Sequence, residues 1–116
     1  MPSFRASVAV IGTRVGVAPP EVLAAARAAV AAASHVEDAF LDVSRLARGA
    51  GPPRVTVRFL VPTQNDRLED ASARRIGQAL QAGVAHVAAC TDLAVLRRRK
   101  GRWIPLDLWR IANDSS

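Results

Sequence analysis

Two histidines are the side chains of this sequence best suited to acid–base catalysis or to metal binding. His35 lies near the end of a predicted helix, and His86 lies within a second one. Glu37 and Asp38 follow His35 beyond that helix end, so the spacing forms no ligand set or catalytic pair. Because a catalytic histidine needs a partner that orients it, we interpret both histidines as polar groups on helix surfaces.

Three carboxylates, Asp66, Glu69 and Asp70, are spaced within one helical turn. Such a cluster is one way to hold a metal ion, but these residues also open a predicted helix. Negative charge complements the dipole at a helix N-terminus, and carboxylates cap the free amides there. We predict a capping box with Asp66 at the N-cap and Glu69 reaching back to its amide, and no metal site.

Cys90 is the only cysteine, and no neighbouring base in the sequence would activate its thiol. We therefore predict a structural role for it. The segment from Gly12 to Gly16 lies between a predicted strand and a predicted helix, as phosphate-binding loops do. Its glycine spacing matches neither the dinucleotide fingerprint nor the Walker motif, so we expect an ordinary connection and no cofactor.

A basic cluster directly before a tryptophan is the most distinctive feature of the sequence. Cations that neutralise phosphates, beside rings that stack on bases, are typical of proteins that bind single-stranded nucleic acid. The same cluster suits an anionic membrane surface, with Trp103, Ile104 and Leu106 at the interface. A third interpretation is a charged strand end that prevents edge-to-edge aggregation. The basic cluster consists of Arg97, Arg98, Arg99, Lys100 and Arg102.

The positive charge of the chain is local. Its 116 residues carry a formal net charge of +6, but outside the basic cluster eleven basic residues face ten acidic ones. The rest of the chain is therefore nearly neutral. Fifteen arginines against one lysine, together with abundant alanine, indicate a GC-rich genome and a bacterial source.

The length suits one domain with its own hydrophobic core, since half of the residues are apolar. A lone cysteine forms no intramolecular disulfide. The short apolar run near the N-terminus is too brief for a signal peptide, and no stretch is long enough to span a membrane. We expect a cytoplasmic protein.

Hydrophobic periodicity predicts six elements. The clearest is a strand after the turn Gly49–Pro53, in which Val55, Val57 and Phe59 alternate with polar residues. The Pro19–Pro20 pair suits the start of a helix. The predicted strands are 5–11, 37–46, 54–61 and 91–96, and the predicted helices run from Glu21 to about Ser34 and from Asp66 to about Ala89.

The resulting order, βαββαβ, predicts an α+β fold of the ferredoxin-like sandwich type. A four-stranded antiparallel sheet would pack two helices on one face, because right-handed crossovers place both helices on the same side. Residues 1–102 would form this domain, and residues 103–116 an apolar C-terminal tail. The fold hosts many functions and therefore specifies no activity.

The other face of that sheet offers a test of one kind of RNA binding. RNA-recognition motifs of this topology need aromatic residues on the outer faces of their first and third strands. The predicted first strand has none, and Phe59 shares the apolar face. Arg54 and Arg58 on the outer face leave an electrostatic form of nucleic-acid binding open.

We predict a non-enzymatic binding or scaffold module that self-associates through its open sheet face and its tail, with a twofold dimer as the expected assembly. The alternative is a nucleic-acid-binding protein that uses the basic cluster on phosphates. An enzyme, with a pocket between sheet and helices, is the third hypothesis. The predicted self-association contacts are Trp103, Ile104, Leu106, Leu108 and Trp109.

Overall fold

The computed structural model describes residues 1–42 and 51–107. Two helices and five strands follow one another along this part of the chain. In chain order they are β1 (Ser3–Thr13), α1 (Pro19–Ala31), β2 (His35–Asp42), β3 (Arg54–Leu60), α3 (Asp66–Ala85), β4 (Ala88–Arg99) and β5 (Arg102–Pro105). The mixed α+β class is therefore confirmed.

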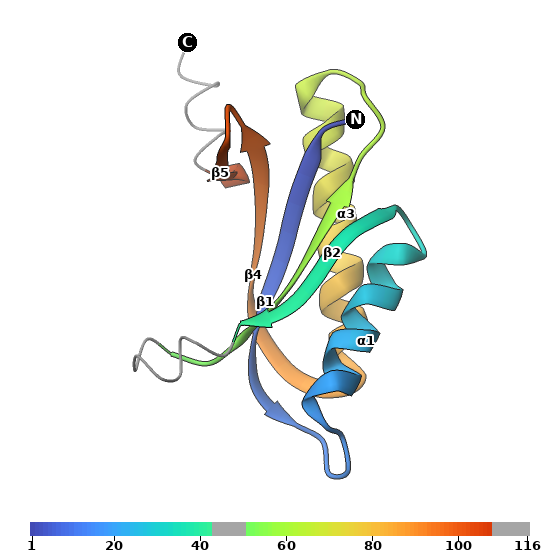
Figure 1. The fold of residues 1–116 in the computed structure, drawn as a ribbon, viewed down its shortest axis with the longest axis vertical. Coiled ribbons are helices and arrows are strands. Elements are labelled where there is room, and N and C mark those ends of the chain that lie inside the picture. The colour runs from blue at the N-terminus through green and yellow to red at the C-terminus, as the bar shows by residue number, and fades with distance from the viewer. Residues whose placement is uncertain (43–50, 108–116) are drawn as a thin grey trace.

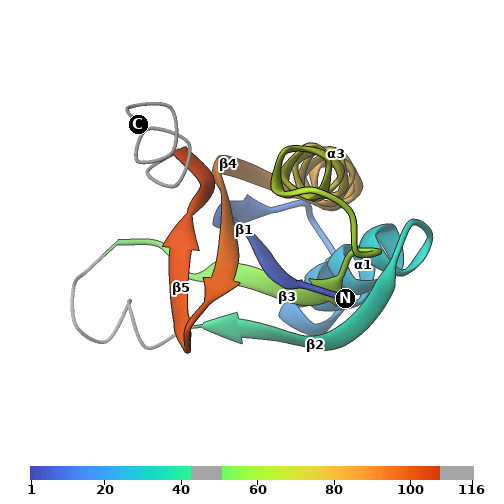
Figure 2. The ribbon, with the colours of Figure 1, turned by 90° about the horizontal axis from the view of Figure 1, so that it is seen from above.

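All five strands belong to one antiparallel sheet, in the order β2-β3-β1-β4-β5. Figure 1 shows the central strands β1 and β3 running along the length of the molecule. Both helices lie on the same side of the sheet, as Figure 2 shows from above. The opposite side, which no described helix covers, is called the open face below.

Strand alternation builds the core between the sheet and the helices. Phe4 of β1 and Phe59 of β3 are opposite each other in the register, and their rings stack at a centroid distance of 6.1 Å. Both are fully buried, as are Val55 and Val57. From the helices, Val22, Val30, Leu80 and Val84 complete this layer. The alternation predicted for residues 54–61 thus places the expected face in the core.

The first turn of α3 differs from the predicted capping box by one residue. Asn65, not Asp66, is the N-cap, and its side-chain oxygen accepts a hydrogen bond from the amide of Leu68. Glu69 does reach back, but its Oε2 accepts from the amide of Gln64 at 2.7 Å. Asp66 is thereby the first helical residue, and its carboxylate is left to interact elsewhere.

The sheet has one strand more than predicted, because β4 runs past Leu96 to Arg99 and turns back as β5. Lys100 and Gly101 form the two-residue turn, and both have positive φ angles of 51° and 78°. This is the geometry of a type I′ hairpin, whose twist matches that of the strands it joins. Residues predicted to start a tail, from Trp103 to Pro105, therefore pair with β4, while residues 108–116 lie outside the described part of the chain.

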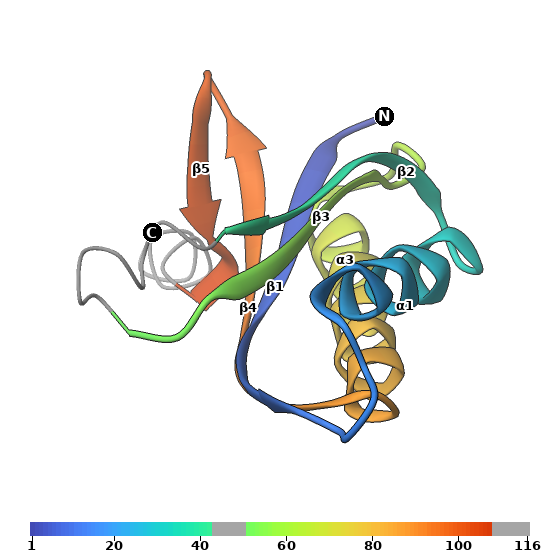
Figure 3. The same ribbon diagram turned by 60° about the horizontal axis from the view of Figure 1, so that its bottom comes forward.

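The β4–β5 hairpin lies on the side of the molecule away from α1, as Figure 3 shows. Leu106, directly after β5, is buried in the main core with only 2% of its surface exposed. The end of the hairpin is thus anchored to the domain. Neither described helix is long and apolar enough to cross a membrane.

Gly83 is a point of close approach between the two helices. A Cβ atom at this position would lie 2.6 Å from the Cβ of Ala29 on α1. Glycine to alanine within a helix ordinarily stabilises it by about 0.5–1 kcal/mol. We expect Gly83→Ala to reverse that sign and lower the free energy of unfolding by about 1–3 kcal/mol, because the two rigid backbones must separate.

Urea denaturation followed by circular dichroism measures this change. Gly12→Ala is the matched control, because no atom lies within 4 Å of the Cβ it would add. The double variant Ala29→Gly, Gly83→Ala should recover part of the loss. Equal stability of Gly83→Ala and the unaltered protein would contradict the close approach of α1 and α3.

Candidate functional site

Strand alternation divides the basic cluster between the two faces of the sheet. Because β4 continues to Arg99, Arg97 pairs with Phe4 and points to the helix side of the sheet. Leu96 pairs with Arg5, whose side chain lies on the open face. Arg98 follows on that same face, opposite Trp103 of β5. The five basic residues therefore do not form one continuous site.

Arg97 is buried beneath the first turn of α3, where it meets three carboxylates. Its Nη2 donates to Glu69 at 2.7 Å and to Asp66 at 3.0 Å, and its Nη1 donates to Asp70 at 2.8 Å. We call these four side chains the carboxylate network. Only 3% of Arg97 is exposed, which leaves little of this side chain for the predicted phosphate contact.

Burial and Arg97 shift the pKa values of Glu69 and Asp70 in opposite directions: burial raises them and Arg97 lowers them. Burial raises the pKa of Asp70 above its ordinary value and outweighs the hydrogen bond from Arg97. Burial also opposes ionisation of Glu69, but the amide of Gln64 and the Arg97 guanidinium hold the pKa of Glu69 below its ordinary value. Within residues 1–42 and 51–107, no group of His, Cys, Asp or Glu side chains is arranged to hold a metal ion.

The open face gathers three arginines around one tryptophan. The Cζ of Arg5 lies 4.3 Å from the centroid of a Trp103 ring, that of Arg98 lies 5.1 Å away, and that of Arg58 lies 5.3 Å away. We call these four residues the tryptophan cluster. Four different strands, β1, β3, β4 and β5, supply one residue each. Guanidinium groups this close to an indole are attracted by its π electrons.

Arg5 is the least compensated cation of the tryptophan cluster. Its Nε is buried and has no hydrogen-bond partner among the described residues. Neither Arg5 nor Arg98 makes an ion pair within the described ranges, whereas the Nε of Arg58 lies 3.1 Å from Glu37. Burial, followed by the charges of Arg58 and Arg98, lowers the pKa of Arg5, and the charge of Asp38 opposes this shift. The arginines are thus close to one another, and only Arg58 forms an ion pair with a carboxylate among the described residues.

Away from the tryptophan cluster the open face is electrically balanced or acidic. Arg54 is held by Asp92, at 2.8 Å, and by the hydroxyl of Ser7. On the edge strand β2, a register shift after Val36 turns Glu37 to the open face. Asp38 and Asp42 occupy the following positions of this face, opposite Arg58 and Arg54.

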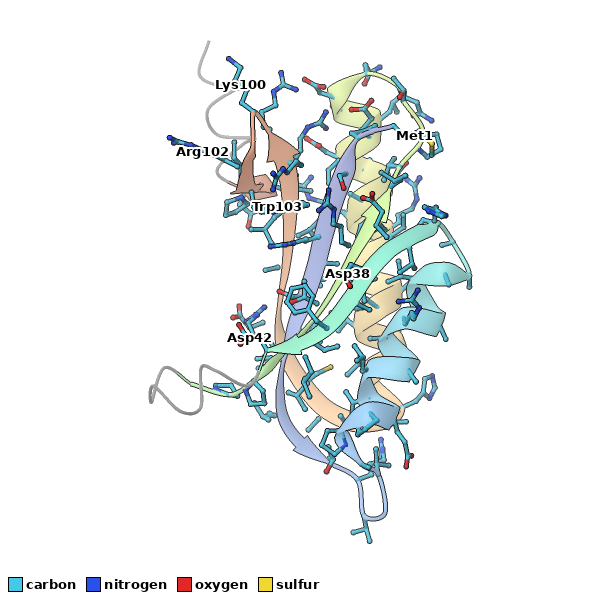
Figure 4. All side chains as sticks on the ribbon, viewed as in Figure 1. Met1, Asp38, Asp42, Lys100, Arg102 and Trp103 are labelled. Carbon is cyan, nitrogen blue, oxygen red and sulfur yellow. The ribbon has the colours of Figure 1, made fainter. Side chains whose placement is uncertain are left out.

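The view in Figure 4 separates these charges in space. Lys100 and Arg102 lie at the tip of the hairpin, and Asp38 and Asp42 lie along β2, with Trp103 between the two groups. Arg98, Arg99, Lys100 and Arg102 are all exposed. Arg99 lies on the helix side, 3.9 Å from Asp66. The exposed cations therefore gather at the hairpin, and the carboxylates lie at the opposite edge of the sheet, on β2.

The predicted self-association contacts are distributed over different environments. Trp103 is half-buried on the open face, and Ile104 pairs with Arg97 and is directed to the helix side. Leu106 belongs to the core of its own chain, which leaves little of its side chain for the predicted contact with a partner. Leu108 and Trp109 lie outside the described residues.

The remaining candidate groups do not converge on a catalytic site. His35 is exposed at the start of β2, and His86 is exposed at the end of α3. Cys90 is half-buried, donates to the carbonyl oxygen of Gln81 at 3.7 Å, and has a pKa raised by burial. That environment disfavours the thiolate needed for nucleophilic attack. In the loop after β1, Arg14 binds the carbonyl oxygen of Ala85 and holds the loop against α3.

Sequence reasoning identified Arg58, Arg98 and Trp103 but missed Arg5 as a site residue. The signal that could have revealed Arg5 was the pair Lys100–Gly101, which forms the two-residue turn between β4 and β5. If β4 is extended to that turn, the returning strand pairs with β4. Since β4 also pairs with β1, Trp103 then comes close to Arg5. Comparison of the chain with protein-family models, curated proteins and solved structures found no match.

Removal of Arg97 tests the carboxylate network. We expect Arg97→Met to lower the free energy of unfolding by about 3–5 kcal/mol at neutral pH, because Glu69 and Asp70 would stay buried without their counterion. The loss should be smaller near pH 5. A carboxylate whose pKa is raised in the folded protein stabilises the fold when protonated, and that contribution disappears as the pH rises through the raised pKa.

Urea denaturation at both pH values measures the two losses. Arg27→Met, at an exposed position of α1, is the matched control and should change stability by no more than about 0.5 kcal/mol. A loss from Arg97→Met that is as small as the control's would show that the network does not hold β4 against α3.

Proposed function

We propose that this protein is a non-enzymatic module that binds single-stranded nucleic acid on the open face of its sheet. The observation that carries the proposal is the tryptophan cluster, in which Arg5 and Arg98 have no carboxylate partner in the described structure. Cations left without a counterion beside an aromatic ring match the phosphates and bases of an exposed strand.

The half-buried position of these groups favours a single strand over a duplex. Arg5 and Trp103 are both only partly exposed, at the level of the sheet surface. In a duplex the base faces are stacked inside the helix, so a ring lying on a sheet cannot reach them. The bases of a single strand are free to stack on aromatic rings and on arginine planes.

The hairpin extends the basic surface in one direction. Lys100 and Arg102 are exposed at its tip, next to Arg98. Phosphates that follow a nucleotide bound at the tryptophan cluster would meet these cations in turn. Arg97 takes no part in this proposal, because its charge is neutralised in the carboxylate network.

We also infer that β1 to β4 with α1 and α3 are a ferredoxin-like βαββαβ unit to which β5 has been added. The neighbouring order β2-β3-β1-β4 within the sheet supports this inference. A cytoplasmic location agrees with the proposed ligand, and a reducing compartment suits the half-buried thiol of Cys90.

Self-association through the open face is the second proposal. Trp103 and Phe40 are half-buried there and would offer aromatic surface to another copy. Against this assembly, a twofold axis through the tryptophan cluster would bring its arginines close to their own copies, and like charges destabilise an interface. We therefore place it after nucleic-acid binding.

Fluorescence anisotropy with labelled single-stranded RNA and DNA tests the first proposal. We expect binding of about micromolar affinity at low salt, which weakens with added salt as if about three to five phosphates were neutralised. Arg98→Gln should weaken binding and reduce the salt slope by about one. Trp103→Leu should cost about tenfold in affinity through lost stacking.

Arg27→Gln is the matched control, because it removes the same charge from the exposed surface of α1. Its affinity should stay close to that of the unaltered protein. Absence of binding at low salt would refute the proposal. If Arg98→Gln and Arg27→Gln reduced the affinity equally, the ligand would bind somewhere other than the open face.

The solution mass tests the second proposal. If the open face and the tail hold an oligomer, Trp103→Ala combined with Trp109→Ala should lower the mass measured by light scattering during size exclusion. The reason is the loss of two large aromatic contacts, which tend to dominate an interface. A mass that is unchanged by both substitutions would exclude the tail as the oligomer contact.

A further inference from the structure

We infer that the tryptophan cluster receives the phosphorylated end of a single strand, so that its ligand is a terminal phosphomonoester. This inference rests on the proposed function, because it specifies which part of a nucleic acid the open face recognises. Three features carry it: the convergence of arginines on one ring, the incomplete compensation of Arg5, and the acidic strand on the far side.

The three guanidinium groups surround one indole. The Cζ atoms of Arg5, Arg58 and Arg98 all lie within 5.3 Å of a Trp103 ring centroid. A single phosphate is small enough to contact two or three such groups together, and guanidinium forks match its oxygens. The phosphodiesters within a strand are spaced along the strand. A row of separated cations would match them better than three arginines around one ring.

Arg5 offers its terminal guanidinium nitrogens to a ligand. The side chain is partly exposed and forms no ion pair among the described residues, whereas its Nε is buried and out of reach of a ligand at the surface. Arg58 already shares its charge with Glu37, and Ser3 binds the same carboxylate. Arg5 and Arg98 form no ion pair in the described part of the chain, although the charge of Asp38 offsets part of that of Arg5. A phosphomonoester carries a charge of about −1.5 to −2 at neutral pH, and this charge matches those two cations.

The acidic edge of the sheet prevents a strand from continuing past the tryptophan cluster. Beyond Arg58, the next strand is β2, which presents Glu37, Asp38 and Asp42 on the open face. Glu37 is already paired with Arg58, but the carboxylate of Asp38 forms no ion pair among the described residues and would repel a further phosphate. Among the described residues, exposed cations continue the other way, from Arg98 to Lys100 and Arg102 at the hairpin tip (Figure 4). A bound strand therefore enters over the hairpin and ends at Arg5.

The experiment compares single strands of one sequence that differ only at their ends. Four versions of an oligonucleotide of about ten nucleotides are needed, with a 5′-phosphate, a 3′-phosphate, a 5′-methylphosphate or hydroxyls at both ends. We expect one phosphorylated version to bind about tenfold more tightly than the dihydroxyl version. If that version is the 5′ one, the methylphosphate should lose most of the gain, because it carries one charge fewer.

Two variants locate the effect. Arg5→Gln should abolish the preference for the phosphorylated end, while Arg102→Gln should weaken binding of all versions alike and keep the preference. Because Arg5 is half-buried, Arg98→Gln at an exposed position serves as a second variant that should reduce the preference without risk to the fold. Circular dichroism of each variant verifies that the domain is folded.

The outcomes separate this inference from the proposed function. Equal affinity for all four versions, with the salt dependence described above, would overturn end recognition and leave single-strand binding in place. No binding of any version would overturn both. Displacement of the oligonucleotide by a nucleoside monophosphate at similar concentration would identify a free nucleotide as the ligand, which also overturns recognition of a strand end.

Discussion

Burial of Arg97 against the first turn of α3 is the constraint on which the arrangement of the open face depends. Successive residues of a strand point to opposite faces, so a buried Arg97 directs Arg98 outward. Across the hairpin, the same register places Trp103 on the open face beside Arg5. A shift of β4 by one residue would exchange the two faces and dissolve the tryptophan cluster.

Hydrophobicity alone would not choose between these registers. Leu93 and Val95 face the helices, but Ala94 and Leu96 on the open face are apolar as well. A buried ion pair is a weak source of stability, because both charges lose water, and its best-attested value is to specify register. The carboxylate network does this with side chains that α3 already uses: Glu69 caps Gln64 with one oxygen and binds Arg97 with the other.

The sequence was most informative where the apolar residues follow a single, regular spacing. Strict alternation over residues 54–61 predicted β3 and its buried face, and the proline pair predicted the start of α1 within a few residues. The hairpin was missed because residues 97–102 are nearly all basic and carry no hydrophobic period. Asn65 and Asp66 are both residue types that favour the N-cap position, so local sequence does not choose between them. The choice depends on tertiary contacts of Arg97 with Asp66 and Glu69, which the sequence does not reveal.

Two arginines on the same face differ in the acceptors that the fold supplies to them. Arg54 is bound by Asp92 and by Ser7, so the domain itself supplies its acceptors. Arg5 instead lies over aromatic rings, between two other arginines, with a buried nitrogen that no described residue accepts from. The π electrons of Trp103 and Phe40 offset only part of the repulsion there. An anion bound at Arg5 would relieve part of this repulsion, which is the physical basis of the phosphate site that we propose at this end of the face.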